Sequence, residues 1–132
     1  MDVLQKYNSL RRYLAENYSP ETQQCVDRAL LYAAERMSQY TRYNGTPMLD
    51  HDVAVAEIAT REIGLGRNST VAAILHDVLR IASKERPEEV DALSREIREQ
   101  FGGPVLGIIV GLCKISNIKL RCRRSRPRIS AI

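Results

Sequence analysis

Aromatic residues are scarce in this sequence: it has no tryptophan and one phenylalanine among 132 residues, so a core must be mostly aliphatic. Its cysteines, Cys25, Cys113 and Cys122, are odd in number and irregularly spaced, which indicates neither a disulfide framework nor a zinc knuckle. No run of about 18 apolar residues is present, so we expect no membrane span. The charged N-terminal segment lacks an apolar signal core. These absences predict reduced thiols and a cytoplasmic protein without a membrane partner.

Acidic residues are missing from residues 119–132, which carry six basic side chains. The whole chain has a formal charge of +4. With six of the 20 basic residues in that tail, the first 118 residues hold 14 basic against 16 acidic residues, a net charge of −2. No aromatic residue lies among the arginines for base stacking, so nucleic acid is not an expected partner. We predict one domain over residues 1–118 and a flexible basic tail over 119–132.

Alanine, leucine, isoleucine and valine are abundant and recur at helical spacing. Ser19 and Pro20 indicate the start of a helix that runs to about Tyr40. Asp50 is predicted to cap the next helix, which ends at Gly64. A further helix is expected to begin within residues 68–70, and no segment alternates with the period of a strand. The pattern predicts an all-α fold.

Histidine occurs only twice, and one copy lies beside an aspartate in an otherwise apolar helix. His76 and Asp77 interrupt the stretch AAILHDVLRI, where burying polar groups without partners is costly. Imidazole and carboxylate are ligands of divalent metals, and His51 from the preceding helix could supply a third ligand. A hydrogen-bonded His–Asp pair without a metal is the alternative interpretation.

Three segments resemble, in order, the N-terminal hydrolase domain of the RelA/SpoT homologues, a branch of the HD-domain phosphohydrolases. They are RYNGTPMLDHDVAVAEI, IGLGRNSTVAAILHDV and EIREQFGGPVLGIIVGLCKISNIK. The resemblance implies an HD-domain helical bundle of about six helices. It also implies one Mn²⁺ ion held by His51, His76 and Asp77, and removal of the 3′-pyrophosphate from (p)ppGpp. Arg42 falls on the family position that packs against the guanine.

The chain departs from the family pattern in two ways that bear on catalysis. Arg80 and Ile81 replace the acidic pair that positions and activates water in the family, so no catalytic residue is assigned. Arginine stays protonated and cannot act as a base; losing a general base typically costs about 10²–10⁴ in rate. No segment resembles ADRLHNM, which carries the family's fourth metal ligand, and three ligands would hold the ion more weakly.

Two functions therefore remain open. The first is a (p)ppGpp 3′-pyrophosphohydrolase with impaired or absent hydrolysis. The second is a catalytically inactive guanine-nucleotide-binding or regulatory module, in which Arg80 and Lys114 face phosphates. Arg80 could equally be a solvated helix residue paired with Glu85 or a neighbour, and the basic tail could bind an anionic partner. The sequence does not distinguish a monomer from a homo-oligomer.

Overall fold

The computed structural model describes residues 2–113, and within this range the chain is helical without a strand. The elements are α1 (Val3–Lys6), α2 (Asn8–Asn17), α3 (Pro20–Met37), α4 (Met48–Ile63), α5 (Arg67–Glu85), the 3-10 turn η1 (Pro87–Glu89), α6 (Val90–Phe101), and a helix over residues 103–113. The prediction of an all-α fold is confirmed. None of the described helices is long and apolar enough to cross a bilayer. Lys114 and the predicted basic tail lie outside the described residues.

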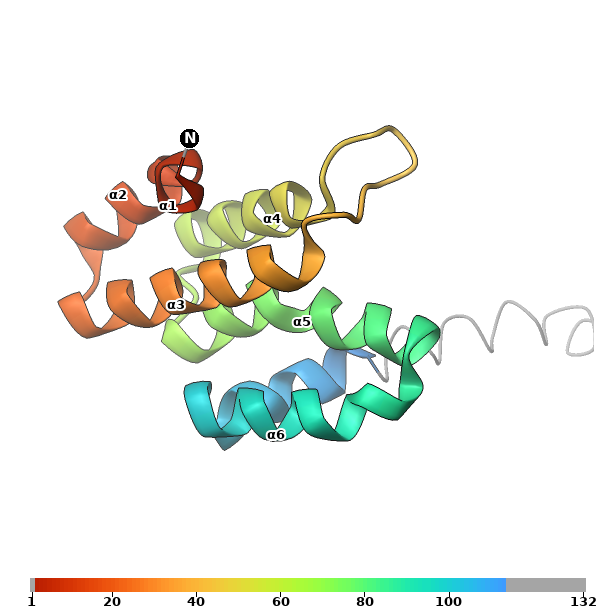
Figure 1. Cartoon of the computed structure of the whole chain (residues 1–132). Coiled ribbons are helices and arrows are strands. Elements are labelled where there is room, and N and C mark those ends of the chain that lie inside the picture. Colours follow the sequence, from red (N-terminus) through yellow and green to blue (C-terminus); the bar gives the residue numbers. More distant parts are fainter. Residues whose placement is uncertain (1, 114–132) are drawn as a thin grey trace, which may run out of the picture.

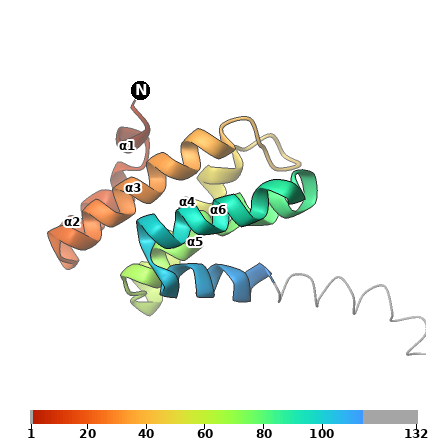
Figure 2. The same ribbon diagram turned by 60° about the horizontal axis from the view of Figure 1, so that its bottom comes forward.

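The long helix α5 lies at the centre of the bundle and contacts α3, α4 and α6. Figure 1 shows α3 and α4 above α5, with α6 and the blue helix of residues 103–113 below it. Figure 2 shows the lower pair brought forward. The short helices α1 and α2 pack on α3. Because α5 is covered from both sides, it carries buried residues around most of its circumference.

The helix boundaries follow capping chemistry in part. Ser19 caps α3 as predicted, since its hydroxyl accepts a hydrogen bond from the Thr22 N–H at 3.2 Å. Gly64 ends α4 with φ +76°, a left-handed conformation that suits glycine. The predicted Asp50 cap is wrong: α4 begins earlier, and the Asp50 carboxylate instead accepts a hydrogen bond from the Tyr7 hydroxyl at 2.6 Å. α5 likewise begins at Arg67, before the predicted start.

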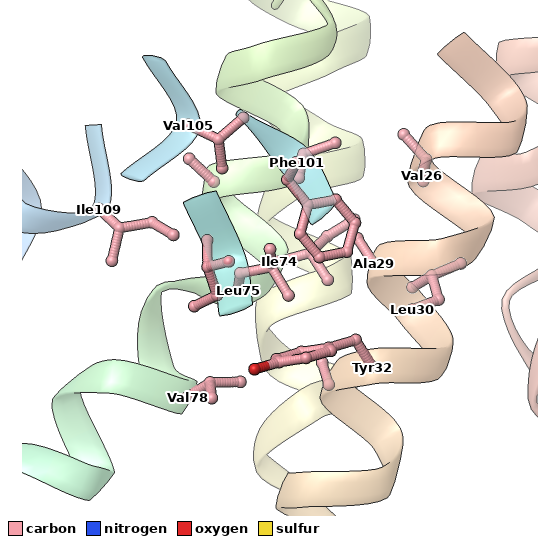
Figure 3. Packing of buried hydrophobic residues seen from close by; sticks show 14 of the residues in the cluster. Val26, Ala29, Leu30, Tyr32, Ile74, Leu75, Val78, Phe101, Val105 and Ile109 are labelled. Atoms are coloured by element: carbon pink, nitrogen blue, oxygen red, sulfur yellow. The ribbon is translucent and has the colours of Figure 1, made fainter. Parts of the chain in front are cut away.

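The core is mostly aliphatic and includes the rings of Tyr32 and Phe101 (Figure 3). Leu30 of α3 and Ile74 of α5 are fully buried. Tyr32 meets the ring of Phe101 edge to face, with centroids 5.8 Å apart, and its hydroxyl donates to Glu96 at 2.9 Å. Burying one aliphatic side chain stabilises the fold by about 1.5–3 kcal/mol. Because helices pack on both sides of α5, the buried side chains of α5 contribute much of this stabilisation.

A short connection sets the register between α4 and α5. Residues 64–66 join the two helices into an antiparallel helical hairpin. Thr60, four residues before the connection, donates its hydroxyl hydrogen to the Ala56 carbonyl at 2.7 Å. The Thr70 hydroxyl, four residues after the connection, must therefore donate to Thr60 across a gap of 3.3 Å. Residues equally far from the connection thus face each other across the hairpin.

Candidate metal centre

Asp52 of α4 and His76 and Asp77 of α5 form a compact group of potential metal ligands. Each offers a donor atom, and these atoms lie within 4.8 Å of one another. Asp52 lies 12 residues before Gly64 and Asp77 lies 11 residues after Gly66. At 1.5 Å per residue, both carboxylates are about 17 Å from the connection. The register of the hairpin therefore places them opposite each other.

The imidazole of His76 is held in one orientation. Its Nδ1 lies 2.8 Å from the carbonyl oxygen of Ala73, which can only accept, so Nδ1 carries a proton and donates. Nε2 then lies 3.4 Å from Oδ1 of Asp77. In the neutral ring, Nε2 presents a lone pair to this carboxylate, and a proton or a cation between the two atoms would remove the repulsion. An imidazole fixed at Nδ1 and free at Nε2 suits metal ligation.

The two carboxylates are almost completely buried, with Asp52 2% and Asp77 3% exposed. Burial, together with the hydrogen bond to Asp77 and its negative charge, raises the pKa of Asp52 to about 9. Burial also acts to raise the pKa of Asp77, but the hydrogen bond with Asp52 and the charges of His76 and Arg80 lower it below its ordinary value. One carboxyl therefore holds the proton and the other the charge.

The Oδ2 atom of Asp52 is buried without a hydrogen-bond donor from the protein. A carboxylate oxygen in this position is costly unless a proton or a cation partners it. A proton on Oδ2 would supply that partner, and a divalent ion held by the site would supply it equally. The donor set of two carboxylates and one imidazole fits a borderline or hard divalent metal.

Arg80 takes part in the same group of charges. One turn after Asp77 on α5, its Nε donates to Oδ1 of Asp77. The ion pair is therefore made with the buried carboxylate rather than with Glu85, the partner considered from the sequence. Because the guanidinium stays protonated, Arg80 adds a permanent positive charge to the centre.

A tight turn before α4 positions Arg42. The Arg42 N–H donates to the Thr46 carbonyl at 2.8 Å, and the Thr46 N–H donates to the Asn44 side chain at 3.0 Å. Gly45 occupies the turn with φ +86°, which an L side chain rarely adopts. The positive charge of Arg42 is close enough to lower the pKa of Asp52, against the larger effect of burial. The turn therefore brings Arg42 to the edge of the centre.

His76 and Asp77 are thus brought together, whereas His51 is not among the clustered donors. His51 is half-buried in the first turn of α4. Its neighbour Asp52 was missed by reasoning from the sequence. The sequence signal was the four-residue spacing of Asp52, Ala56 and Thr60, which the structure shows to be a buried stripe of α4. That stripe faces α5, and His51 lies about 100° away from it around the helix.

Two further residues define the surroundings of the centre. Ile81, at the second position of the family's acidic pair, is 6% exposed and belongs to the hydrophobic core. Cys113, from the helix over residues 103–113, is half-buried. Burial raises the pKa of its thiol, while the charge of Arg80 lowers it and that of Asp77 raises it. A third element of the fold therefore approaches the centre.

Comparison with known proteins identifies the family. The HD domain family matches residues 29–130, which is most of the chain and includes the whole candidate centre. The chain belongs to the HD domain family. The matched residues include His76 and Asp77, which the structure places beside a second aspartate, Asp52.

The HD domain is homologous to enzymes of (p)ppGpp metabolism. It is 29% identical over 109 residues to a guanosine-3′,5′-bis(diphosphate) 3′-pyrophosphohydrolase of Aquifex aeolicus, covering 83% of this chain and 14% of the relative. It is 31% identical over 112 residues to the bifunctional (p)ppGpp synthase/hydrolase SpoT of Escherichia coli, covering 84% and 15%. A GTP pyrophosphokinase rsh of Brucella ovis is 24% identical over 124 residues, covering 93% and 15%. No solved structure matches the chain significantly.

Proposed function

We propose that this HD domain acts in alarmone metabolism, binding (p)ppGpp together with a divalent ion and hydrolysing it slowly or not at all. The observation that supports this most directly is the convergence of Asp52, His76 and Asp77 in a chain homologous to (p)ppGpp hydrolases. The resemblance to the RelA/SpoT homologues favours Mn²⁺ as the ion. The matched segment covers about a seventh of each of these relatives, so activity and substrate are proposals for this chain.

The residues of the centre would divide the work as follows. Asp52, His76 and Asp77 would hold the ion, which when bound would polarise a phosphoryl oxygen or activate water. Ala73 fixes the ring of His76 through the Nδ1 hydrogen bond. Arg42, at the rim, would stack on the guanine. Arg80 cannot accept a proton from water, so it cannot act as a general base, and we therefore expect slow or absent hydrolysis.

The second candidate function is a catalytically inactive nucleotide-binding or regulatory module. The pairing of Arg80 with Asp77 favours it. The resemblance to the RelA/SpoT homologues implies an acid at this position, and this chain has a permanent cation there. Such a module would keep nucleotide binding and lose turnover. The two functions differ only in the rate of the chemical step, so binding experiments test what they share.

The ligand set is tested by titrating Mn²⁺ into wild type, Asp52→Asn and His51→Ala in a calorimeter. Asp52→Asn is expected to weaken Mn²⁺ binding by about tenfold or more, the scale of effects at residues that support metal sites. Asparagine matches the uncharged state of Asp52 in the metal-free protein, so the fold is expected to persist. His51→Ala is the control and should bind as wild type does. The opposite result would assign the third ligand to His51.

Nucleotide binding is tested by titrating ppGpp, GDP and ATP in the presence of Mn²⁺. We expect ppGpp to bind best, and Arg42→Ala to weaken its binding by about tenfold through loss of guanidinium stacking. Arg61→Ala removes an arginine that lies over the Tyr13 ring and pairs with Glu57, and should leave the affinity unchanged. Equal affinities for all three nucleotides would contradict the proposed guanine specificity.

A further inference from the structure

Asp77 and Arg80 form a neutral pair at the centre of the candidate site. Asp77 is 3% exposed, and its Oδ1 accepts from the Nε of Arg80. A buried carboxylate requires a counter-charge, and the guanidinium supplies a full one that is not lost at any ordinary pH. The fold therefore carries its own cation at the position where a metal ligand set converges.

The imidazole of His76 and the guanidinium of Arg80 approach the same oxygen atom of Asp77. His76 Nε2 lies 3.4 Å from Oδ1 of Asp77, so these two residues could hold an ion together beside Arg80. Arg80 donates to that same Oδ1. A divalent cation and a guanidinium beside one buried carboxylate would repel each other. The guanidinium and the ion therefore each weaken the binding of the other to Asp77.

Arg80 can leave this position without unfolding the helix. Its side chain is 30% exposed, whereas that of Asp77 is 5% exposed. The long side chain of arginine therefore has a route to water by rotation about its own bonds, and the helical backbone of α5 is not disturbed. The guanidinium is thus a movable counter-ion beside a fixed carboxylate.

We infer that Arg80 is a tethered counter-ion that competes with the divalent metal for Asp77, so that the metal binds only by displacing it. This inference rests on the metal centre of the proposed function. It predicts a domain that is folded and charge-balanced without metal, and whose affinity for metal is lowered by its own arginine. Removing the guanidinium would convert a self-neutralised site into one that requires an ion.

The test compares wild type with Arg80→Met by Mn²⁺ calorimetry and by thermal unfolding with and without Mn²⁺. Arg80→Met is expected to bind Mn²⁺ about tenfold more tightly, because wild type must break the contact between Arg80 and Asp77 to bind the ion. Without metal the variant should melt at a lower temperature, and Mn²⁺ should restore it more than it raises wild type. Arg61→Met, which removes an exposed arginine of α4, is the control and should not change Mn²⁺ affinity.

Arg80→Gln serves as a second variant with the same expected gain in Mn²⁺ affinity. Glutamine removes the charge but keeps a neutral hydrogen-bond donor for Asp77, so this variant is expected to fold more readily than Arg80→Met. Equal Mn²⁺ affinities in wild type and in the folded Arg80 variants would overturn the inference and leave the metal centre standing. No Mn²⁺ binding by any of these proteins would overturn the metal centre and the inference together.

Discussion

Incubated with ppGpp and Mn²⁺, the purified chain is expected to release little or no pyrophosphate. The centre offers carboxylates for an ion, but Arg80 is a permanent cation and Ile81 is apolar, so neither can deprotonate water. Loss of a general base typically lowers the rate by about 10²–10⁴. Steady-state release of pyrophosphate measures the rate of hydrolysis directly. Turnover in the usual enzymatic range of about 1–10³ per second would contradict the prediction.

Restoring an acid tests the physical reason for this slow rate. Arg80→Glu should raise pyrophosphate release relative to wild type, while Arg80→Gln, which differs from it only in lacking an ionisable group, should not. Equal rates in the two variants would show that displacement of the arginine, rather than a new base, is responsible for any gain. Ile81→Asp is a less useful addition, because Ile81 is buried in the core and its replacement would bury a further carboxylate.

Ile74→Ala should destabilise the domain by about 2–5 kcal/mol, because it opens a cavity in the centre of α5 that the packed neighbours cannot fill. Ile74 is fully buried among the core side chains (Figure 3). Ile58→Ala on α4 makes the same chemical change at a residue that is 62% exposed, and should alter the free energy of unfolding by less than about 0.5 kcal/mol. Urea unfolding followed by circular dichroism measures both.

The comparison of these two isoleucines also tests the arrangement of the bundle. If Ile58→Ala were as damaging as Ile74→Ala, the outer face of α4 would be packed against something, and its exposure in the monomer would not describe the protein in solution. If both were harmless, the central position of α5 between two layers would be wrong. The expected difference of about 2 kcal/mol or more is well above measurement error in such unfolding curves.

Much of the fold follows from local patterns in the sequence. Ser19 and Gly64 act through their own backbone and nearest neighbours, so their roles as caps could be predicted. Asp50 could not, because its carboxylate is taken by the Tyr7 hydroxyl and by Lys6, residues more than 40 positions away. A capping residue that has a strong tertiary partner no longer serves the helix end beside it.

The candidate site shows the same division. The adjacency of His76 and Asp77 in an apolar helix is a local signal, and it led to the residues that the structure places together. Asp52 depends on the register between two helices, which periodicity alone does not give. Arg80 and Asp77 are three residues apart on one helix, a spacing that allows an ion pair. The sequence could not show that Asp77 is buried.

The three-residue connection between α4 and α5 also determines where this chain tolerates changes in length. One residue inserted into either helix between Asp52 and Asp77 would turn the following segment by about 100° and carry one carboxylate away from the other. An insertion in the turn that precedes α4 would shift both aspartates as a unit and preserve their spacing. Insertions and deletions are therefore expected outside the helical hairpin, whereas within it they would separate Asp52 from Asp77.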